Sequence, residues 1–97
     1  MSAKAKKTTA ERKRYTITFD DWLDTGETLD SVTYEVTPTT DNPLVIDDAQ
    51  VLTNGRECEF YAEGGDDGVT YSVVATGVTS REQTKEFEMT FFVRDLE

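Results

Sequence analysis

The sequence predicts an all-β fold, an antiparallel β-sandwich of about seven strands, and three observations support this prediction. The apolar residues, 36% of the 97-residue chain, are mainly Val, Phe, Tyr and Ile, which favour strands over helices. From residue 15 onward apolar and polar residues alternate with a period of two, and no apolar helical period exceeds one turn. Turn signals recur about every 8 to 12 residues, as expected for short strands of a sandwich.

The charge of the chain is distributed unevenly. Residues 1–14 contain six basic residues and one acid, whereas residues 15–97 contain four basic residues and nineteen acids. Residues 1–14 have too little apolar surface to offset the entropy of ordering, so we expect a flexible basic N-terminal arm on an acidic domain, residues 15–97. The arm residues expected to contact a partner are Lys4, Lys6, Lys7, Arg12, Lys13 and Arg14.

The first half of the domain is expected to contain strands at residues 15–19 and 31–37. Alternate residues in each are apolar, as in a strand with one buried face. Pro38 and the polar residues after it end the second strand, because proline cannot donate to a ladder. The predicted inward residues are Tyr15, Ile17, Phe19, Val32, Tyr34 and Val36.

Residues 44–52 predict either one bent strand or two short strands, because Asp47 and Asp48 interrupt the apolar pattern. Asn54-Gly55 then predicts a hairpin with a type I′ turn, which requires positive φ at both central residues. The next strand, residues 56–62, is expected to bury alternate positions. Those positions are Cys58, Phe60 and Ala62. The single cysteine has no disulfide partner and is therefore expected to be a small core residue.

The glycine- and aspartate-rich residues 63–68 predict a turn, and the strands at 69–78 and 86–93 are the longest and most regular. A regular pair of this kind lies at the centre of one sheet in immunoglobulin-like sandwiches. We therefore predict an immunoglobulin-like arrangement. The expected inward residues of the pair are Val69, Tyr71, Val73, Ala75, Phe87, Met89, Phe91 and Val93.

Residues 20–30, DDWLDTGETLD, are too polar for a core strand and are expected to close one open end of the sandwich. Trp22 and Leu23 are predicted to plug that end, and Thr25-Gly26 to turn the chain back into the next strand. The acids of this loop are expected to face solvent. These acids are Asp20, Asp21, Asp24 and Glu27.

Three segments carry a resemblance to a known family. The segments are DWLDTGETL at residues 21–29, S-x-T-y-x-V at 31–36, and the run from Gly68 to Val93. Together they resemble small tailed-bacteriophage proteins with an immunoglobulin-like fold, which often carry a D-W-L-x-x-G-E-T motif. The chain departs from that pattern at residues 80–82, where Ser-Arg-Glu replaces a glycine-arginine pair, and in its basic arm.

The resemblance implies a virion structural protein, assembled in the host cytoplasm, whose partners are other virion subunits. We expect first a capsid decoration protein that docks on the head lattice with its arm on neighbouring subunits, with a homo-oligomer on the lattice as one option. The alternatives are a neck-, tail- or fibre-associated protein, or a module whose arm binds packaged nucleic acid. The acidic domain disfavours nucleic acid, and the chain contains no apolar run long enough to span a membrane.

No enzyme, cofactor or metal is expected. The chain contains no histidine, so Ser-His-Asp and Cys-His arrangements are absent, and GGDDG lacks the lysine and helix of a phosphate loop. Loop carboxylates offer hard oxygen ligands for calcium, but their spacing matches no EF-hand, and we favour a solvated acidic rim. The calcium candidates are Asp66, Asp67 and Gly68, or Asp41, Asn42 and Asp47.

Overall fold

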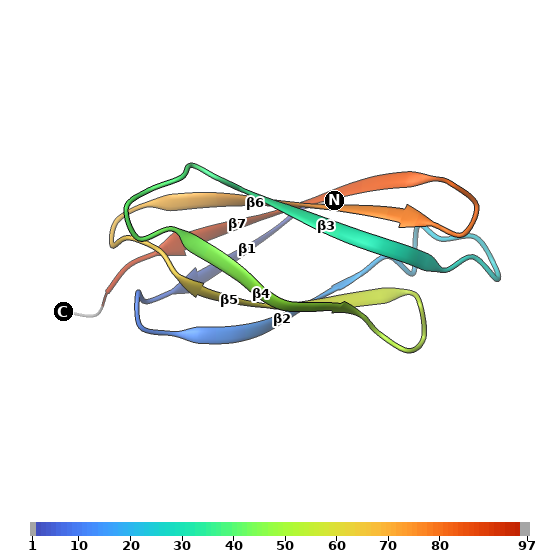
Figure 1. Ribbon diagram of the computed structural model, residues 1–97, viewed down its shortest axis with the longest axis horizontal. Helices are drawn as coiled ribbons and strands as arrows, with labels where there is room; N and C mark the ends of the chain where they lie inside the picture. The colour runs from blue at the N-terminus through green and yellow to red at the C-terminus, as the bar shows by residue number, and fades with distance from the viewer. Residues whose placement is uncertain (1, 96–97) are drawn as a thin grey trace.

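The structure, a computed structural model, describes residues 2–95 and shows the predicted β-sandwich (Figure 1). Two sheets face each other, and no helix occurs among the described residues. The strands are β1 (Ser2–Lys7), β2 (Arg12–Thr18), β3 (Leu29–Thr37), β4 (Leu44–Val51), β5 (Glu57–Gly64), β6 (Thr70–Thr79) and β7 (Thr84–Val93).

The four-stranded sheet has the order β1-β7-β6-β3, and the three-stranded sheet has the order β2-β5-β4. The long β6–β7 hairpin occupies the centre of the larger sheet, which confirms that prediction. All strand pairs are antiparallel except β1 with β7, which run parallel from Ser2 opposite Glu88 to Lys7 opposite Val93. The sandwich expected for residues 15–97 is therefore antiparallel as predicted, and the parallel edge comes from β1, in the segment expected to be an arm.

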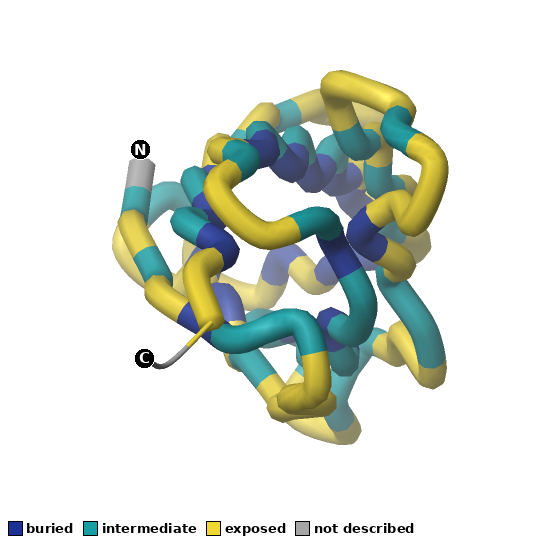
Figure 2. The backbone as a smooth tube through the Cα atoms, turned by 90° about the vertical axis from the view of Figure 1, so that its left-hand side faces the viewer, coloured by how far each residue is buried: buried dark blue, intermediate teal, exposed yellow. Residues whose placement is uncertain are grey.

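The core lies between the sheets and consists mainly of the residues that alternation assigned to it. Buried and less buried positions alternate along the central strands (Figure 2). Phe60 and Phe91 are fully buried, and the Tyr15 ring lies 5.8 Å from the first and 5.0 Å from the second. Six predicted inward residues are only partly buried against this core: Tyr15, Val32, Tyr34, Val36, Val69 and Phe87.

The N-terminal residues 2–14 are not the expected loose arm. They form β1 and the start of β2, with a turn between them. Ala3 and Ala5 pack against the core, and the backbone amide of Arg94 donates to the Lys7 carbonyl at 2.9 Å. Small inward side chains and a backbone ladder thus order a segment whose composition alone predicted disorder. Met1 lies outside the described residues.

A bulge in β4 and the turn after it decide two details of the strand pattern. Residues 44–51 form one strand with a bulge between Asp47 and Gln50, so the bent-strand alternative is confirmed. The β4–β5 hairpin is also confirmed, but of its Asn54-Gly55 pair only Gly55 has positive φ, at 69°. Its amide donates to the Leu52 carbonyl at 2.8 Å. The turn is therefore not type I′.

Candidate partner-binding surface

The loop between β2 and β3, residues 19–28 and hereafter the lid loop, closes one end of the sandwich. Leu23 is buried with 6% exposure and Trp22 is partly buried, which confirms the predicted plug. Glu27, however, is only 1% exposed. The expectation that all four acids face solvent is therefore wrong for Glu27, while the other three are exposed.

Glu27 is buried because its carboxylate is fully supplied with donors. Thr79 Oγ1 donates to Oε2 at 2.5 Å, Gln83 Nε2 donates to the same oxygen at 2.9 Å, and the Asp24 amide donates to Oε1 at 3.0 Å. These hydrogen bonds hold the pKa of Glu27 below its ordinary value of 4.5, and the bond from Thr79 has the largest effect. Burial acts in the opposite sense and raises the pKa. The Glu27 carboxylate therefore joins the lid loop to the β6–β7 turn.

Arg56, in the β4–β5 hairpin, holds the lid loop from the other side. Its guanidinium donates to the carbonyls of Leu23 and Glu27 at 3.2 and 3.0 Å, and to those of Asp20 and Asp24 at 3.0 and 3.3 Å. It also pairs with the Asp20 carboxylate. The D-W-L-x-x-G-E-T segment therefore has a structural role that its contacts explain.

Three of the six basic residues expected to bind a partner are engaged within the chain. Lys7 is buried, and its Nζ donates to the carbonyls of Thr8 and Gly64 at 2.5 and 2.6 Å. Burial lowers the pKa of Lys7, against neighbouring carboxylates that raise it. Arg12 pairs with Asp48 at 2.5 Å, and Arg14 lies 3.6 Å from Glu59. The structure therefore does not present the six residues as one surface.

Lys4 and Lys6 are exposed on the outer face of the larger sheet, opposite Thr90 and Phe92 of β7. Arg94 follows two residues after Phe92 and is exposed as well. Within residues 3–95, no acid lies within 4 Å of the charged groups of Lys4, Lys6 or Arg94. Lys13 stands apart from these three on β2, with Nζ 6.0 Å from the Tyr15 ring.

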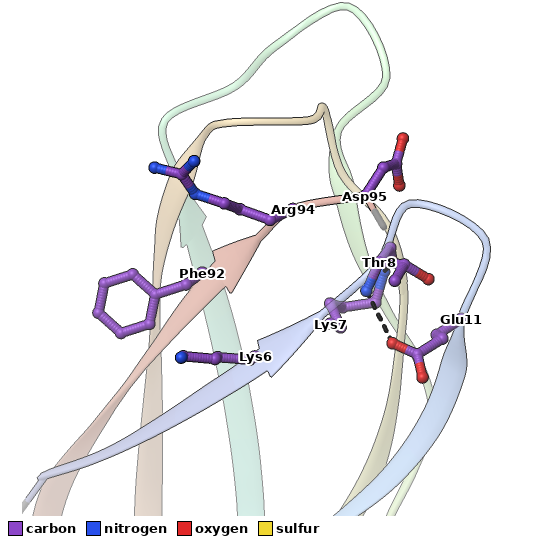
Figure 3. A pocket seen from close by; sticks show the side chains of 7 residues that line it. All are labelled: Lys6, Lys7, Thr8, Glu11, Phe92, Arg94 and Asp95. Atoms are coloured by element: carbon purple, nitrogen blue, oxygen red, sulfur yellow. Dashed lines mark hydrogen bonds between the residues drawn. The ribbon is translucent and has the colours of Figure 1, made fainter. Parts of the chain in front are cut away.

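Lys6 and Arg94 line a hollow of about 500 Å³ where β1 and β7 end (Figure 3). A second hollow of about 220 Å³ shares Lys6 and Phe92 with it. We call the two together the β1/β7 groove. Figure 3 shows Lys6, Phe92 and Arg94 projecting to one side. The groove is lined by Lys4, Ala5, Lys6, Lys7, Thr8, Glu11, Phe92, Arg94 and Asp95.

Asp66, one of the carboxylates considered for calcium, is hydrogen-bonded within the chain. Asp66 accepts hydrogen bonds from the Asn42 backbone at 3.3 Å and from the Asn42 side chain at 3.0 Å, and these bonds lower the pKa of Asp66. In the described part of the chain, no three His, Cys, Asp or Glu residues are grouped to hold a metal ion. The same residues contain no helix with the length and apolar character needed to cross a bilayer.

The fold and this surface together define a small β-sandwich whose most distinctive exposed feature is a basic groove at a sheet edge. Its sequence matches the model of a bacteriophage family over residues 7–92. The chain belongs to this family, described as podophage GP4 fiber-tail adaptor protein gp77. It is accordingly a phage virion structural protein that associates with other virion proteins, as the resemblance implied.

Similarity to other known proteins is limited to the fold. No curated protein matches the chain in sequence. Among solved structures, it resembles part of a 2,6-sialyltransferase from Vibrionaceae Photobacterium sp. JT-ISH-224, described in a ternary complex with CMP and lactose, at 12% identity and a TM-score of 0.50. The similarity covers 97% of this chain but only 18% of that enzyme. It supports the sandwich fold and carries no activity across.

Proposed function

We propose that this chain is an adaptor that joins a fibre to the tail of a podophage particle. The family match over residues 7–92 is the observation that carries this proposal. It favours the tail- or fibre-associated alternative over head decoration, which we expected first and which the family description does not support. The role is one of attachment, without catalysis.

The shape of the molecule suits attachment. An adaptor must hold two partners at separate surfaces, and this sandwich measures 47 by 21 by 19 Å along its principal axes. Its two ends differ: the lid loop lies at one end, and β1 and β7 run to the other (Figure 1), where the larger hollow of the β1/β7 groove lies. Two unlike ends on a rigid body can contact two unlike proteins.

The nucleic-acid alternative loses support from the placement of the basic residues. Arg12 and Arg14 are paired with acids on the chain's own sheet, and Lys7 is buried. A phosphate backbone gains affinity from each free cation that it contacts, so these three contribute little. The net charge of −10 acts against binding as well.

Particles assembled without this chain test the proposal. We expect filled heads and tails that lack fibres in electron micrographs, with fibres restored when the wild-type chain is supplied in trans. Gold-labelled antibody should mark the tail of wild-type particles. Fibre-bearing tails in the absence of the chain, or label spread over the head, would contradict the adaptor role.

A further inference from the structure

We propose that the β1/β7 groove binds an acidic, extended segment of a neighbouring virion protein. This inference rests on the proposed function and deepens it, because it names one of the two attachment surfaces and the chemistry of the partner. Four side chains carry it, together with the free edge of β1. The side chains are Lys4, Lys6, Phe92 and Arg94.

The groove gathers unpaired positive charges on an acidic protein. The chain has twenty acids and ten basic residues. Each arginine except Arg94 pairs with a carboxylate within 4 Å. Lys4, Lys6 and Arg94 have no such partner within residues 3–95, yet they gather around one groove. A groove of this charge selects a partner of the opposite sign and speeds the encounter with it.

The groove also has an apolar floor. Phe92 lies between Lys6, its neighbour across the ladder, and Arg94, and it lines both hollows. An aromatic side chain flanked by cations provides an apolar contact for the body of a partner residue while the cations bind its carboxylates. The larger hollow, about 500 Å³, has room for several side chains.

The groove lies next to a sheet edge. β1 is the outermost strand of its sheet, so the backbone groups along its outer side lack a ladder within this sheet. An extended peptide can add to such an edge through main-chain hydrogen bonds. The β1/β7 groove runs beside this edge, so a segment that adds there can place its acidic side chains against Lys4 and Lys6.

Protection against aggregation is the competing explanation for lysines on an edge strand. It accounts for Lys4 and Lys6 but not for Phe92 and Arg94, which belong to the interior strand β7 and the residues after it. A protected edge also does not require an apolar ring beside its charges. The shared groove therefore favours binding over protection.

The groove suits a peptide better than a nucleic acid. Glu11 and Asp95 line the larger hollow together with the cations. The Thr9 amide and hydroxyl donate to Asp95 at 2.9 and 2.7 Å, and they lower the pKa of its carboxyl, which keeps it charged. Two carboxylates repel a phosphate backbone along this path, whereas a peptide can keep its acids on the Lys4 and Lys6 side.

Zero-length coupling in intact particles tests the inference directly. A carbodiimide joins lysine amines to carboxylates in contact, so we expect mass spectrometry to find Lys4 or Lys6 coupled to an Asp or Glu of another virion protein. If other residues of this chain couple to tail and fibre proteins while Lys4 and Lys6 stay uncoupled, the groove inference fails and the adaptor role stands. Coupling of Lys6 to a head protein alone would support the groove and contradict the adaptor role.

Purified protein provides the second test. The probe is a fluorescent peptide of alternating Glu and Leu, with a Gln-for-Glu peptide as its neutral counterpart. We expect the double variant Lys6→Glu/Arg94→Glu to bind the acidic peptide at least ~10-fold more weakly than wild type, about 1.4 kcal/mol. Lys85→Glu reverses one lysine charge beside Trp22, away from the groove, and should bind the acidic peptide as wild type does.

The outcomes of the second test separate the alternatives. Because Lys6 and Arg94 are exposed, their reversal should leave the melting temperature within a few degrees of wild type. Equal binding by the double variant, equal binding of the Gln peptide, or no binding by wild type would overturn the inference. Tighter binding of a single-stranded oligonucleotide of equal charge would assign the groove to nucleic acid and overturn it too.

Discussion

The hydroxyl of Thr79 donates a hydrogen bond of 2.5 Å to the carboxylate of Glu27, across 52 residues of sequence. The same hydroxyl accepts from the backbone amides of Arg81 and Gln83 at 3.2 and 3.1 Å. One buried acid therefore organises both the lid loop and the β6–β7 turn. The closed end of the sandwich depends on a charge that sequence patterns place in solvent.

Glu27→Gln is expected to reduce the acid sensitivity of the fold. Hydrogen bonds to the carboxylate hold its folded pKa below 4.5, so its stabilising effect is complete above that pH and is lost as pH falls through the folded value. Urea unfolding from about pH 7 to about pH 3 should show a steeper loss for wild type than for the variant. Asp66 and Asp95, whose pKa values are also lowered, leave some slope in both proteins.

Asp30→Asn is the matched control for Glu27→Gln. Asp30 is exposed and accepts no hydrogen bond from the described residues. Its variant should therefore keep the wild-type slope. A Glu27→Gln protein with the same slope as wild type and Asp30→Asn would show that the carboxylate makes no net contribution to acid sensitivity.

Arg56→Lys is expected to loosen the lid loop. The planar guanidinium reaches four carbonyls of that loop at once, and an ammonium on a flexible stem cannot reproduce the pattern. We expect a loss of about 1–3 kcal/mol in the free energy of unfolding, measured in urea. Arg14→Lys, at a side chain 63% exposed with one pair at 3.6 Å, should cost well under about 1 kcal/mol. Equal losses would contradict the role of Arg56.

Alternation in the sequence was sufficient to predict the central strands. In β5 and β6 every second side chain is buried, and Phe60, Tyr71 and Ala75 all lie where a period of two places them. The signal is local, because one buried sheet face imposes it on each strand separately. For the same reason it assigned Cys58 to the core.

The features that sequence patterns did not predict depend on distant partners. Lys7 bonds to Gly64, 57 positions away, and Arg56 bonds to a loop about 30 positions earlier. β1 has no hydrophobic stripe, since its inward residues are two alanines and a lysine, and its partner β7 lies at the other end of the chain. The basic composition of residues 1–14 identified Lys4 and Lys6 as candidate partner-binding residues. Phe92 and Arg94 lie beside them only because β7 pairs with β1.

Tyr71→Phe is expected to free the turn before β6. The buried Tyr71 hydroxyl accepts the Asp66 amide at 2.8 Å and lies 2.7 Å from Thr40 Oγ1. Its removal should cost about 1–2 kcal/mol of unfolding free energy and speed hydrogen exchange at the Asp66 amide. Tyr34→Phe is the contrasting change, because the buried Tyr34 hydroxyl faces only the Cys58 thiol, a weak hydrogen-bonding group, and makes no other hydrogen bond to the described residues. That variant should be neutral or slightly stabilising, and the reverse order would contradict both assignments.

Gly65→Ala is expected to destabilise the protein more than Gly68→Ala, although both glycines have positive φ, 94° and 84°. A Cβ at Gly65 would lie 2.9 Å from Val93 Cγ2 and 3.2 Å from Tyr71 Cε2, whereas a Cβ at Gly68 would meet nothing within 4 Å. Both variants bear the cost of a left-handed alanine, about 1 kcal/mol, and overpacking adds about 1–3 kcal/mol at Gly65 alone. Val93 and Tyr71 are fully buried and cannot move aside. Urea unfolding of the two variants measures the difference, and equal losses would mean that the strand ends around Gly65 relax to admit the methyl group.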